Sequence, residues 1–400
     1  MQTSWRVGSL FEIPLYLDPL WFGIVAIATI NFGVAYTQWG SVLAWSAGLV
    51  MALLLFGSVL LHELGHSLVA RAQGIKVNSI TLFFFGGIAA IEEESKTPGG
   101  AFQVAIAGPA VSIGLSILLI LLSLALPVNS LVSQMSGDLA RINLVLALFN
   151  LIPGLPLDGG QVFKAAIWKA TGDRFKAVRW AARGGQVLGW MAIAAGLAVD
   201  FFTGQLITGL WIALLGWFGI RNASAYERVT IVQETLLKIV AADAASKDFR
   251  VIDADQTLRS FADSYLLQTT APETYFAASD GRYRGIVAID DLRTIERSEW
   301  EYKTVNDILH PLSDIPTVNE STPIVAVINQ LETKQLPRVT VLSPAGAVAG
   351  VIDRGDIVRT VGEKLNKPFA EADIKRVKEE GSYPPGLQLA AIAKSVTNDL

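Results

Sequence analysis

The sequence predicts a polytopic α-helical membrane protein of about six transmembrane helices with a membrane-associated β-hairpin, followed by a soluble α/β module. Three observations support this fold class. The first 220 residues are overwhelmingly apolar, whereas charged residues concentrate after Arg221. The mean hydropathy is +0.44, with 10 Trp and 35 Gly, which is typical of membrane proteins. After residue 253 the chain repeats itself, which indicates a duplicated unit.

Six stretches are predicted to cross the bilayer as helices. A spanning helix needs roughly 20 mostly apolar residues, because the hydrocarbon core is about 30 Å thick. Four stretches without any charged residue meet this rule, and two weaker candidates accompany them: 19–37, 41–61, 101–126 and 201–220, then 141–152 and 184–199. An even number of crossings places both termini on the same side of the membrane.

The distribution of Lys and Arg predicts that this side is the cytoplasm, because cytoplasmic loops carry the excess of positive charge. The predicted outer loops, 38–40, 127–140 and Asp200, hold neither residue type, and only Arg141 lies at an outer edge. The predicted cytoplasmic segments hold Arg71, Lys76, Lys96, Lys164, Lys169, Arg174, Lys176, Arg179, Arg183 and Arg221. We therefore expect a multi-pass protein of a prokaryotic cell membrane, in contact with lipid, with both termini cytoplasmic.

A short segment between the second and third predicted helices has the composition of a β-hairpin. Residues 79–91 read SITLFFFGGIAAI, which is too short to span the bilayer and rich in β-branched and aromatic residues. Paired glycines interrupt it. Non-helical backbone at membrane depth must be satisfied by protein or by a water-filled cavity. The segment is either such a hairpin or an ordinary buried loop.

The motif His62-Glu63-Leu64-Gly65-His66 matches H-E-x-x-H and lies at the end of the second predicted helix. Residues at i and i+4 share one helix face, so both imidazoles can reach one ion, and the Glu63 carboxylate can take a proton from water there. Zinc suits this ligand set. Ionisable side chains are costly in an apolar helix, which favours a functional site over an interfacial cluster of polar residues.

A third zinc ligand must be His, Asp or Glu, because the chain has no Cys and three His in all. The remaining His310 lies in the polar half before a proline and is more typical of a solvated linker. Asp158, in the run NLIPGLPLDGG of residues 150–160, is the better candidate. Its alternative role is that of a helix N-cap.

These motifs together resemble the site-2 protease family of intramembrane metalloproteases. The resemblance rests on HELGH, Phe85-Gly86-Gly87, Gly108-Pro109 and NLIPGLPLDGG, and it covers residues 1–225. It implies that His62, His66 and Asp158 hold one zinc ion per chain and that Glu63 is the catalytic base. It further implies that Asn150 lies near the scissile carbonyl and that the hairpin, with Phe85, Gly86 and Gly87, pairs with an extended substrate. A transmembrane substrate, such as a membrane-bound transcription regulator or an anti-sigma factor, is the implied partner, and no basic run suggests nucleic acid.

The polar half repeats with a spacing of 65 residues, as Thr257, Gly281, Gly285 and Asp291 recur as Thr322, Gly346, Gly350 and Asp356. Each copy reads as helix, strand, Gly-containing turn, strand and helix. The pattern resembles a pair of cystathionine-β-synthase (CBS) motifs, which often bind adenine nucleotides, and a CBS pair can also mediate dimerisation. Asp291 and Asp356 either contact a nucleotide ribose or cap their helices. Where nucleotide-binding repeats carry Thr or Ser, this chain has Ala288 and Asp353, which weakens the case for an anionic ligand.

The predicted organisation is therefore a transmembrane zinc metalloprotease domain (1–225), a linker (226–242), two CBS repeats (243–310 and 311–366) and a C-terminal helix and tail (367–400). The tail, rich in small residues after Pro384, is expected to be mobile. The CBS pair is expected to regulate substrate access. The alternatives are a membrane transporter or channel gated by the CBS pair, and a catalytically silent membrane scaffold. The intact HELGH motif argues against both.

Overall fold

The computed structural model describes residues 4–84, 86–266, 274–384 and 386–397. The chain divides into two compact units, Met1–Thr230 and Ile231–Leu400. Each unit has hydrophobic clusters of its own. The break in the structure therefore follows the change in composition that the sequence shows after Arg221.

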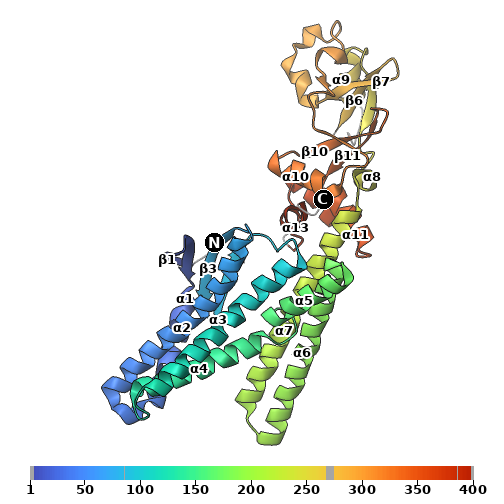
Figure 1. Ribbon diagram of the computed structural model, residues 1–400. Helices are drawn as coiled ribbons and strands as arrows, with labels where there is room; N and C mark the ends of the chain where they lie inside the picture. Colours follow the sequence, from blue (N-terminus) through green and yellow to red (C-terminus); the bar gives the residue numbers. More distant parts are fainter. Residues whose placement is uncertain (1–3, 85, 267–273, 385, 398–400) are drawn as a thin grey trace. The chain divides into compact units, whose positions relative to one another are not determined.

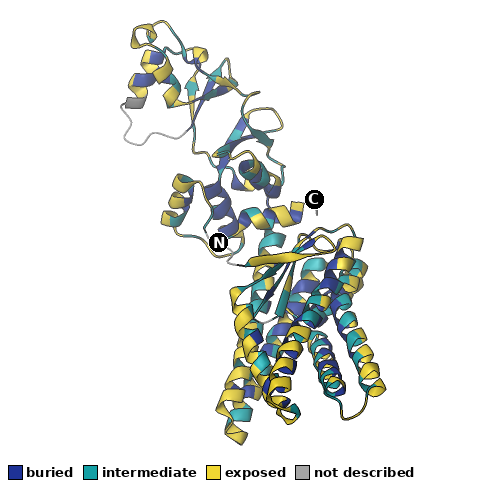
Figure 2. Cartoon of the chain, turned by 90° about the vertical axis from the view of Figure 1, so that its left-hand side faces the viewer, coloured by how far each residue is buried: buried dark blue, intermediate teal, exposed yellow. Residues whose placement is uncertain are grey.

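The first unit is built mainly of helices (Figure 1). These are α1 (Pro19–Ala35), α2 (Ser41–Ala72), α3 (Pro98–Ala125), α4 (Leu131–Asn150), α5 (Asp158–Thr171), α6 (Arg174–Thr203) and α7 (Leu206–Lys238), with a short 3-10 helix η1 at Thr37–Trp39. Of the helices in the described ranges, α2, α3, α6 and α7 are long and apolar enough to cross a membrane, and α1 is a shorter apolar helix. Exposed residues, yellow in Figure 2, cover much of the outer faces of these helices. Many of them are large and apolar, as expected for contact with lipid.

Each of the six predicted spans overlaps a helix, but several boundaries were wrong. The helix of the fifth span, α6, begins at Arg174 instead of near residue 184, and that of the sixth, α7, continues to Lys238, through most of the predicted linker 226–242. The second helix continues through HELGH to Ala72 instead of ending near residue 61. The fourth helix begins at Leu131, so most of the predicted outer loop 127–140 is helical. Ser130 caps this helix by accepting a hydrogen bond from the Ser133 amide, and the Tyr36 hydroxyl donates to the Asp138 carboxylate at 3.2 Å. The Asp138 carboxylate, which the sequence placed in a loop, therefore has a hydrogen-bond partner inside the helical bundle.

A four-stranded sheet of order β1-β2-β3-β4 completes the first unit. Its strands are β1 (Trp5–Leu10), β2 (Ile13–Leu17), β3 (Val77–Phe83) and β4 (Gly86–Ile91). The antiparallel pair β3–β4 confirms the predicted hairpin, and β4 is an outer strand. The β1–β2 hairpin was not predicted. Phe11 and Glu12 occupy its turn with positive φ, where hairpins usually carry Asn or Gly, so the usual sequence signal is missing.

The second unit contains the duplicated fold. The first copy comprises β5 (Arg250–Asp253), α9 (Leu258–Leu266), β6 (Tyr275–Ser279) and β7 (Arg282–Val287), with β8 (His310–Pro311) at the sheet edge. The second comprises β9 (Thr317–Asn319), α10 (Ile324–Thr333), β10 (Arg338–Leu342), β11 (Val348–Asp353) and α11 (Arg354–Lys364). In both copies the first strand pairs parallel with the second, and the second pairs antiparallel with the third. The predicted repeat is therefore a structural repeat.

Two expectations about the second unit were wrong. The helix expected to close the first copy is a single 3-10 segment, Ile289–Thr294, because Leu292 is its one buried residue and little packing holds a longer helix. The predicted C-terminal helix is present as α12 (Glu371–Glu380), but the segment after Pro384 that was expected to be a mobile tail contains a further helix, α13 (Leu389–Val396). Leu389, Ala393 and Val396 are fully buried in one cluster with α10 and α11. Further short helices are α8 (Ala241–Ala244), η3 (Arg297–Glu299) and η4 (Val305–Asp307).

Candidate metal centre

The two histidines of HELGH lie on the same face of α2, one helical turn apart. His62 is 4% exposed and His66 8% exposed, and their Nε2 atoms are 3.3 Å apart. The spacing of four residues produces this geometry, because successive helical turns place such side chains one above the other. Because α2 continues to Ala72, the pair lies inside the helix and not at its end.

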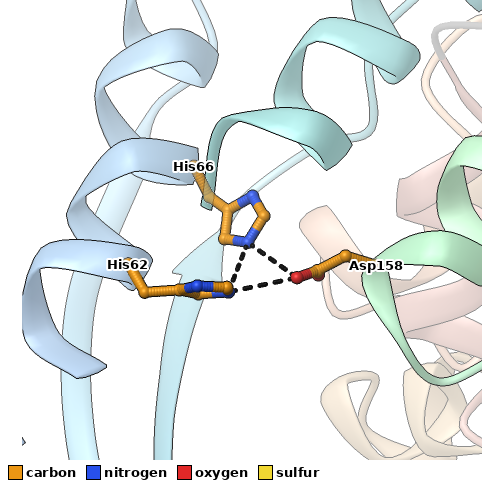
Figure 3. Close-up of side chains that lie close together, drawn as sticks. All are labelled: His62, His66 and Asp158. Carbon is orange, nitrogen blue, oxygen red and sulfur yellow. Dashed lines mark hydrogen bonds and ion pairs between the residues drawn. The ribbon is translucent and has the colours of Figure 1, made fainter. Parts of the chain in front are cut away.

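The carboxylate of Asp158 meets both histidines from the opposite side (Figure 3). Asp158 Oδ2 lies 3.1 Å from His62 Nε2 and 3.3 Å from His66 Nε2. Asp158 is the first residue of α5, and the N-cap position belongs to Leu157, which makes no side-chain capping bond. The N-cap alternative for Asp158 is therefore wrong. Within the described residues, His62, His66 and Asp158 form the group whose ligand atoms lie close enough to hold one metal ion.

Hydrogen bonds on the far side of each imidazole orient the two rings. His66 Nδ1 lies 2.6 Å from the carbonyl oxygen of Val104, and His62 Nδ1 lies 2.9 Å from Ser112 Oγ. A carbonyl oxygen can only accept, so Nδ1 of His66 carries a proton, and in the neutral imidazole Nε2 then presents the lone pair. Metal-ligating histidines usually have such a partner on the second ring nitrogen. Both partners come from α3, which packs against α2.

The three facing atoms fit a zinc ion. Ligand atoms about 2.0–2.1 Å from a tetrahedral ion lie roughly 3.3 Å from one another. The three separations here are 3.1, 3.3 and 3.3 Å. The donor set and its spacing therefore both suit zinc with a fourth position open.

Gly108 of α3 leaves room for the ligand atoms. A Cβ atom added at this position would lie 2.2 Å from His66 Nε2 and 2.6 Å from His62 Nε2. Both distances are far below van der Waals contact. The Gly108-Pro109 motif thus has a physical reason, since any side chain at residue 108 would occupy the space between the two histidines.

Glu63 lies against the outer strand of the sheet. Its carboxylate faces the backbone N–H of Ala89 in β4. A Cβ atom added at Gly87 would lie 2.5 Å from Glu63 Cγ, so the strand passes directly over this side chain. Glu63 is adjacent to the three ligand residues without belonging to their group. This position suits a base that serves a metal without binding it.

The remaining predicted residues lie in different places. Asn150 is the last residue of α4, and the loop 151–157 joins it to α5. Gly86 opens β4 with φ of 137°, a conformation that requires glycine, whereas Phe85 lies outside the described residues. His310 belongs to the second unit, where its Nε2 lies 3.1 Å from Asp291 Oδ2. It is a surface partner of Asp291.

The two candidate nucleotide residues both make capping bonds. Asp291 accepts from the backbone N–H of Ala288, and Asp356 accepts from that of Asp353. Asp356 is also paired with Lys378 of α12, whose Nζ lies 2.9 Å from Asp356 Oδ1 and 3.2 Å from Asp353 Oδ2. Burial raises the pKa of Asp356, and the neighbouring Asp353 carboxylate raises it further. Lys378, with Arg359 at 3.6 Å from Asp356 Oδ1, thus supplies positive charge in an acidic site.

Sequence reasoning missed the residues that support the ligands. Ser112 lies four residues after Gly108, so the helical period that places Gly108 at the histidines also places Ser112 there. Lys164 is 3% exposed on α5, and its Nζ lies 3.0 Å from the carboxylate of Glu94. In the sequence, Lys164 is a single lysine between apolar residues, and it was counted only as a cytoplasmic positive charge.

An apolar helical bundle that brings H-E-x-x-H together with a carboxylate is the arrangement of a membrane metalloprotease. The sequence profile of peptidase family M50 matches residues 50–141 and 128–194, and that of the CBS domain matches residues 305–363. A protein of Synechocystis named "Putative zinc metalloprotease sll0528" is 40% identical over 363 residues, covering 90% of this chain and 96% of that protein. The chain therefore belongs to the M50, or site-2 protease, family.

Two further comparisons accompany this match. The Mycobacterium tuberculosis protein named "Putative zinc metalloprotease Rip3" is 34% identical over 345 residues, covering 86% of this chain and 87% of that protein. The solved site-2 protease from Methanocaldococcus jannaschii is 30% identical and covers 56% of this chain and 95% of that chain, with a TM-score of 0.41. Membership in the family makes this a zinc metalloprotease with a CBS domain and decides against the transporter alternative.

Proposed function

We propose that this protein is an intramembrane zinc endopeptidase that hydrolyses peptide bonds of transmembrane substrates, with zinc held by His62, His66 and Asp158. The observation that carries the proposal is the triangle of three ligand atoms, two from buried histidines and one from the partly buried Asp158, with sides of 3.1, 3.3 and 3.3 Å. When bound, zinc lowers the pKa of water and polarises a peptide carbonyl. The protein's part is to orient the ligands and to place a base beside them.

Glu63 is the proposed base. A carboxylate next to a metal site can accept a proton from the attacking water and later give it to the leaving amine. The Ala89 N–H and the close approach of Gly87 hold the side chain in place. Asn150, at the end of α4, is the proposed donor to the oxygen of the scissile carbonyl. Its role rests on the family resemblance.

The outer strand β4 is the proposed substrate platform. A transmembrane helix satisfies its own backbone hydrogen bonds, so a peptide bond within it must be unwound before cleavage. An extended segment can add to the edge of a sheet through main-chain hydrogen bonds. Because β4 passes over Glu63, such a segment lies beside the base. Gly86, Gly87 and Phe85 are the proposed contacts.

The test compares membranes of cells that carry the wild-type protein with those that carry Glu63→Gln. Quantitative mass spectrometry should find membrane-spanning stubs that accumulate only with the variant, and the purified wild-type protein should cleave one of them. Equal stub abundance in both, with equal zinc content, would contradict the proposal. We expect the stubs to include membrane-bound transcription regulators or anti-sigma factors. We further propose a prokaryotic cell membrane as the location, with both termini cytoplasmic.

We also propose that the paired CBS module controls access to the metal centre. Support comes from the duplicated fold and the CBS match. The test compares cleavage by the full chain and by a chain that ends at Thr230, both with measured zinc content. Equal cleavage rates and an equal substrate range would show that the module does not control access to the metal centre. Gel filtration in detergent, with and without the second unit, tests whether the module also forms a dimer.

Adenine nucleotides are the first ligands to test at this module. The carboxylates of Asp353 and Asp356 disfavour an anion, so we expect weak binding that needs the Lys378 ammonium to turn towards phosphate. Calorimetry of the full chain with AMP and ATP measures this directly. Binding that is unchanged in Lys378→Met would contradict this role of Lys378.

A further inference from the structure

Lys164 is a buried cation close to the metal centre with no role in the proposed chemistry. It lies on α5, the helix that begins with Asp158, and only 3% of its surface is exposed. Lysine is rarely buried this far unless a charged partner compensates for the loss of water. A buried lysine therefore indicates a specific pairing that fixes the helix.

The partner of Lys164 is Glu94. The carboxylate Oε2 of Glu94 lies 3.0 Å from Lys164 Nζ and 3.3 Å from a guanidinium nitrogen of Arg174, the first residue of α6. Partial loss of water alone would raise the pKa of Glu94, whose side chain is still 44% exposed, but the Lys164 ammonium and the Arg174 guanidinium outweigh this and hold that pKa below its usual value of 4.5. Glu94 is therefore ionised at neutral pH, and one carboxylate joins two helices.

Glu94 lies in the segment 92–97 that joins β4 to α3. On one side of this segment, β4 carries the Ala89 N–H that holds Glu63. On the other side, α3 carries Val104 and Ser112, which orient the two histidines. The ion pair between Glu94 and Lys164 thus connects the segment 92–97 to α5, the helix that supplies Asp158.

The distance between Asp158 and the two histidines of α2 depends on how α5 is held in place. Helix α5 packs mainly on α3 and α6, so its placement relative to the histidines of α2 is indirect. Asp158 and Lys164 are six residues apart, which is about 9 Å along a helix axis and roughly 120° around it. An anchor at Lys164 therefore limits both the sliding of α5 and its rotation.

We propose that Glu94 and Lys164 form a positioning pair that sets Asp158 Oδ2 against the Nε2 atoms of His62 and His66. The inference rests on the proposed function, because it takes Asp158 as a zinc ligand. Neither residue touches the metal or the substrate in this scheme. Their loss is expected to change metal affinity and ligand geometry while the fold remains.

The experiment uses the full-length protein in detergent, with Lys164→Met, Glu94→Gln and the double variant. The matched control is Lys169→Met, which removes an exposed lysine from the same helix. Zinc affinity is measured by competition with a chromophoric chelator, and the protein loaded with Co²⁺ reports ligand geometry through its visible absorption. Arg174 remains beside Glu94 in Lys164→Met, so this variant does not leave an isolated carboxylate and should fold.

Lys164→Met and Glu94→Gln should each weaken zinc binding roughly ten- to a hundredfold and alter the Co²⁺ spectrum. The double variant should be no weaker than the worse single variant, since both remove one interaction. Lys169→Met should match the wild type. Zinc affinity within twofold of wild type in Lys164→Met, or losses that add in the double variant, would overturn the proposal. If Lys164→Met does not fold, the test rests on Glu94→Gln, and zinc affinity within twofold of wild type in that variant would overturn the proposal.

Asp158→Asn, measured in parallel, separates this proposal from the proposed function. If Asp158→Asn keeps zinc with wild-type affinity, the ligand assignment is wrong and the positioning role falls with it. If Asp158→Asn loses zinc while Lys164→Met and Glu94→Gln do not, the ligand assignment stands and the positioning pair is refuted.

Discussion

Replacement of Gly108 by alanine is the smallest change that should disable the metal centre. The added Cβ would lie 2.2 Å from His66 Nε2 and 2.6 Å from His62 Nε2. Contact between such atoms normally begins near 3.4 Å, so one imidazole or the whole of α3 must move by about 1 Å. A site held to about 0.5 Å does not tolerate such a shift, and misplacement by about 1 Å can cost a hundredfold in activity.

The matched control is Gly114→Ala on the same helix, where an added Cβ meets nothing within 4 Å. Alanine is about 1 kcal/mol better than glycine inside a helix, so neither change should harm the helix itself. The assay is zinc content per chain after dialysis, together with thermal unfolding of each variant. We expect Gly108→Ala to lose most of its zinc and Gly114→Ala to keep it. Equal zinc retention by two folded variants would refute the packing argument at Gly108.

Three further predictions concern the base, the topology and the acidic site of the second unit. Glu63→Gln should keep zinc and lose cleavage, because the residue lies outside the ligand group; loss of the metal would make Glu63 a ligand. A cysteine at exposed Asn129 should react with an impermeant thiol reagent outside sealed cells, whereas one at exposed Lys247 should react only after the membrane is opened; equal labelling would contradict the orientation. Lys378→Met should destabilise the second unit by about 2 kcal/mol at neutral pH, because the buried Asp356 then loses the nearer of its two cations and keeps only Arg359 at 3.6 Å. The pKa of Asp356 is already raised, so its protonation should relieve this penalty as the pH falls below neutrality; a penalty independent of pH in unfolding experiments would contradict the pairing.

The sequence was sufficient for the helices, the hairpin and the repeat, because each has its own period or composition. Charge-free stretches correspond to α1, α2 and α3 within a few residues, apart from the end of α2. The i, i+4 spacing of His62 and His66 sufficed to place both imidazoles at one point. A local sequence pattern predicts this geometry because both histidines lie in the same helix.

The missed features depend on contacts between segments that are distant in sequence. Asp158 lies 96 residues from His62, and no local pattern decides between a ligand and an N-cap. Lys164 and Glu94 are 70 residues apart, and each reads as an ordinary surface charge by itself. The C-terminal α13 is helical because it is buried against α10, which a small-residue composition does not reveal.

The central claim is that zinc is held by two imidazoles and one carboxylate in a chain without cysteine. X-ray absorption at the zinc edge of the purified full-length protein tests it directly. We predict one zinc per chain, about 2.0–2.1 Å from nitrogen and oxygen ligands, with the outer-shell scattering of two imidazoles. In Asp158→Ala the zinc should be lost. A protein that keeps no zinc, or a spectrum with a single imidazole, would contradict the account.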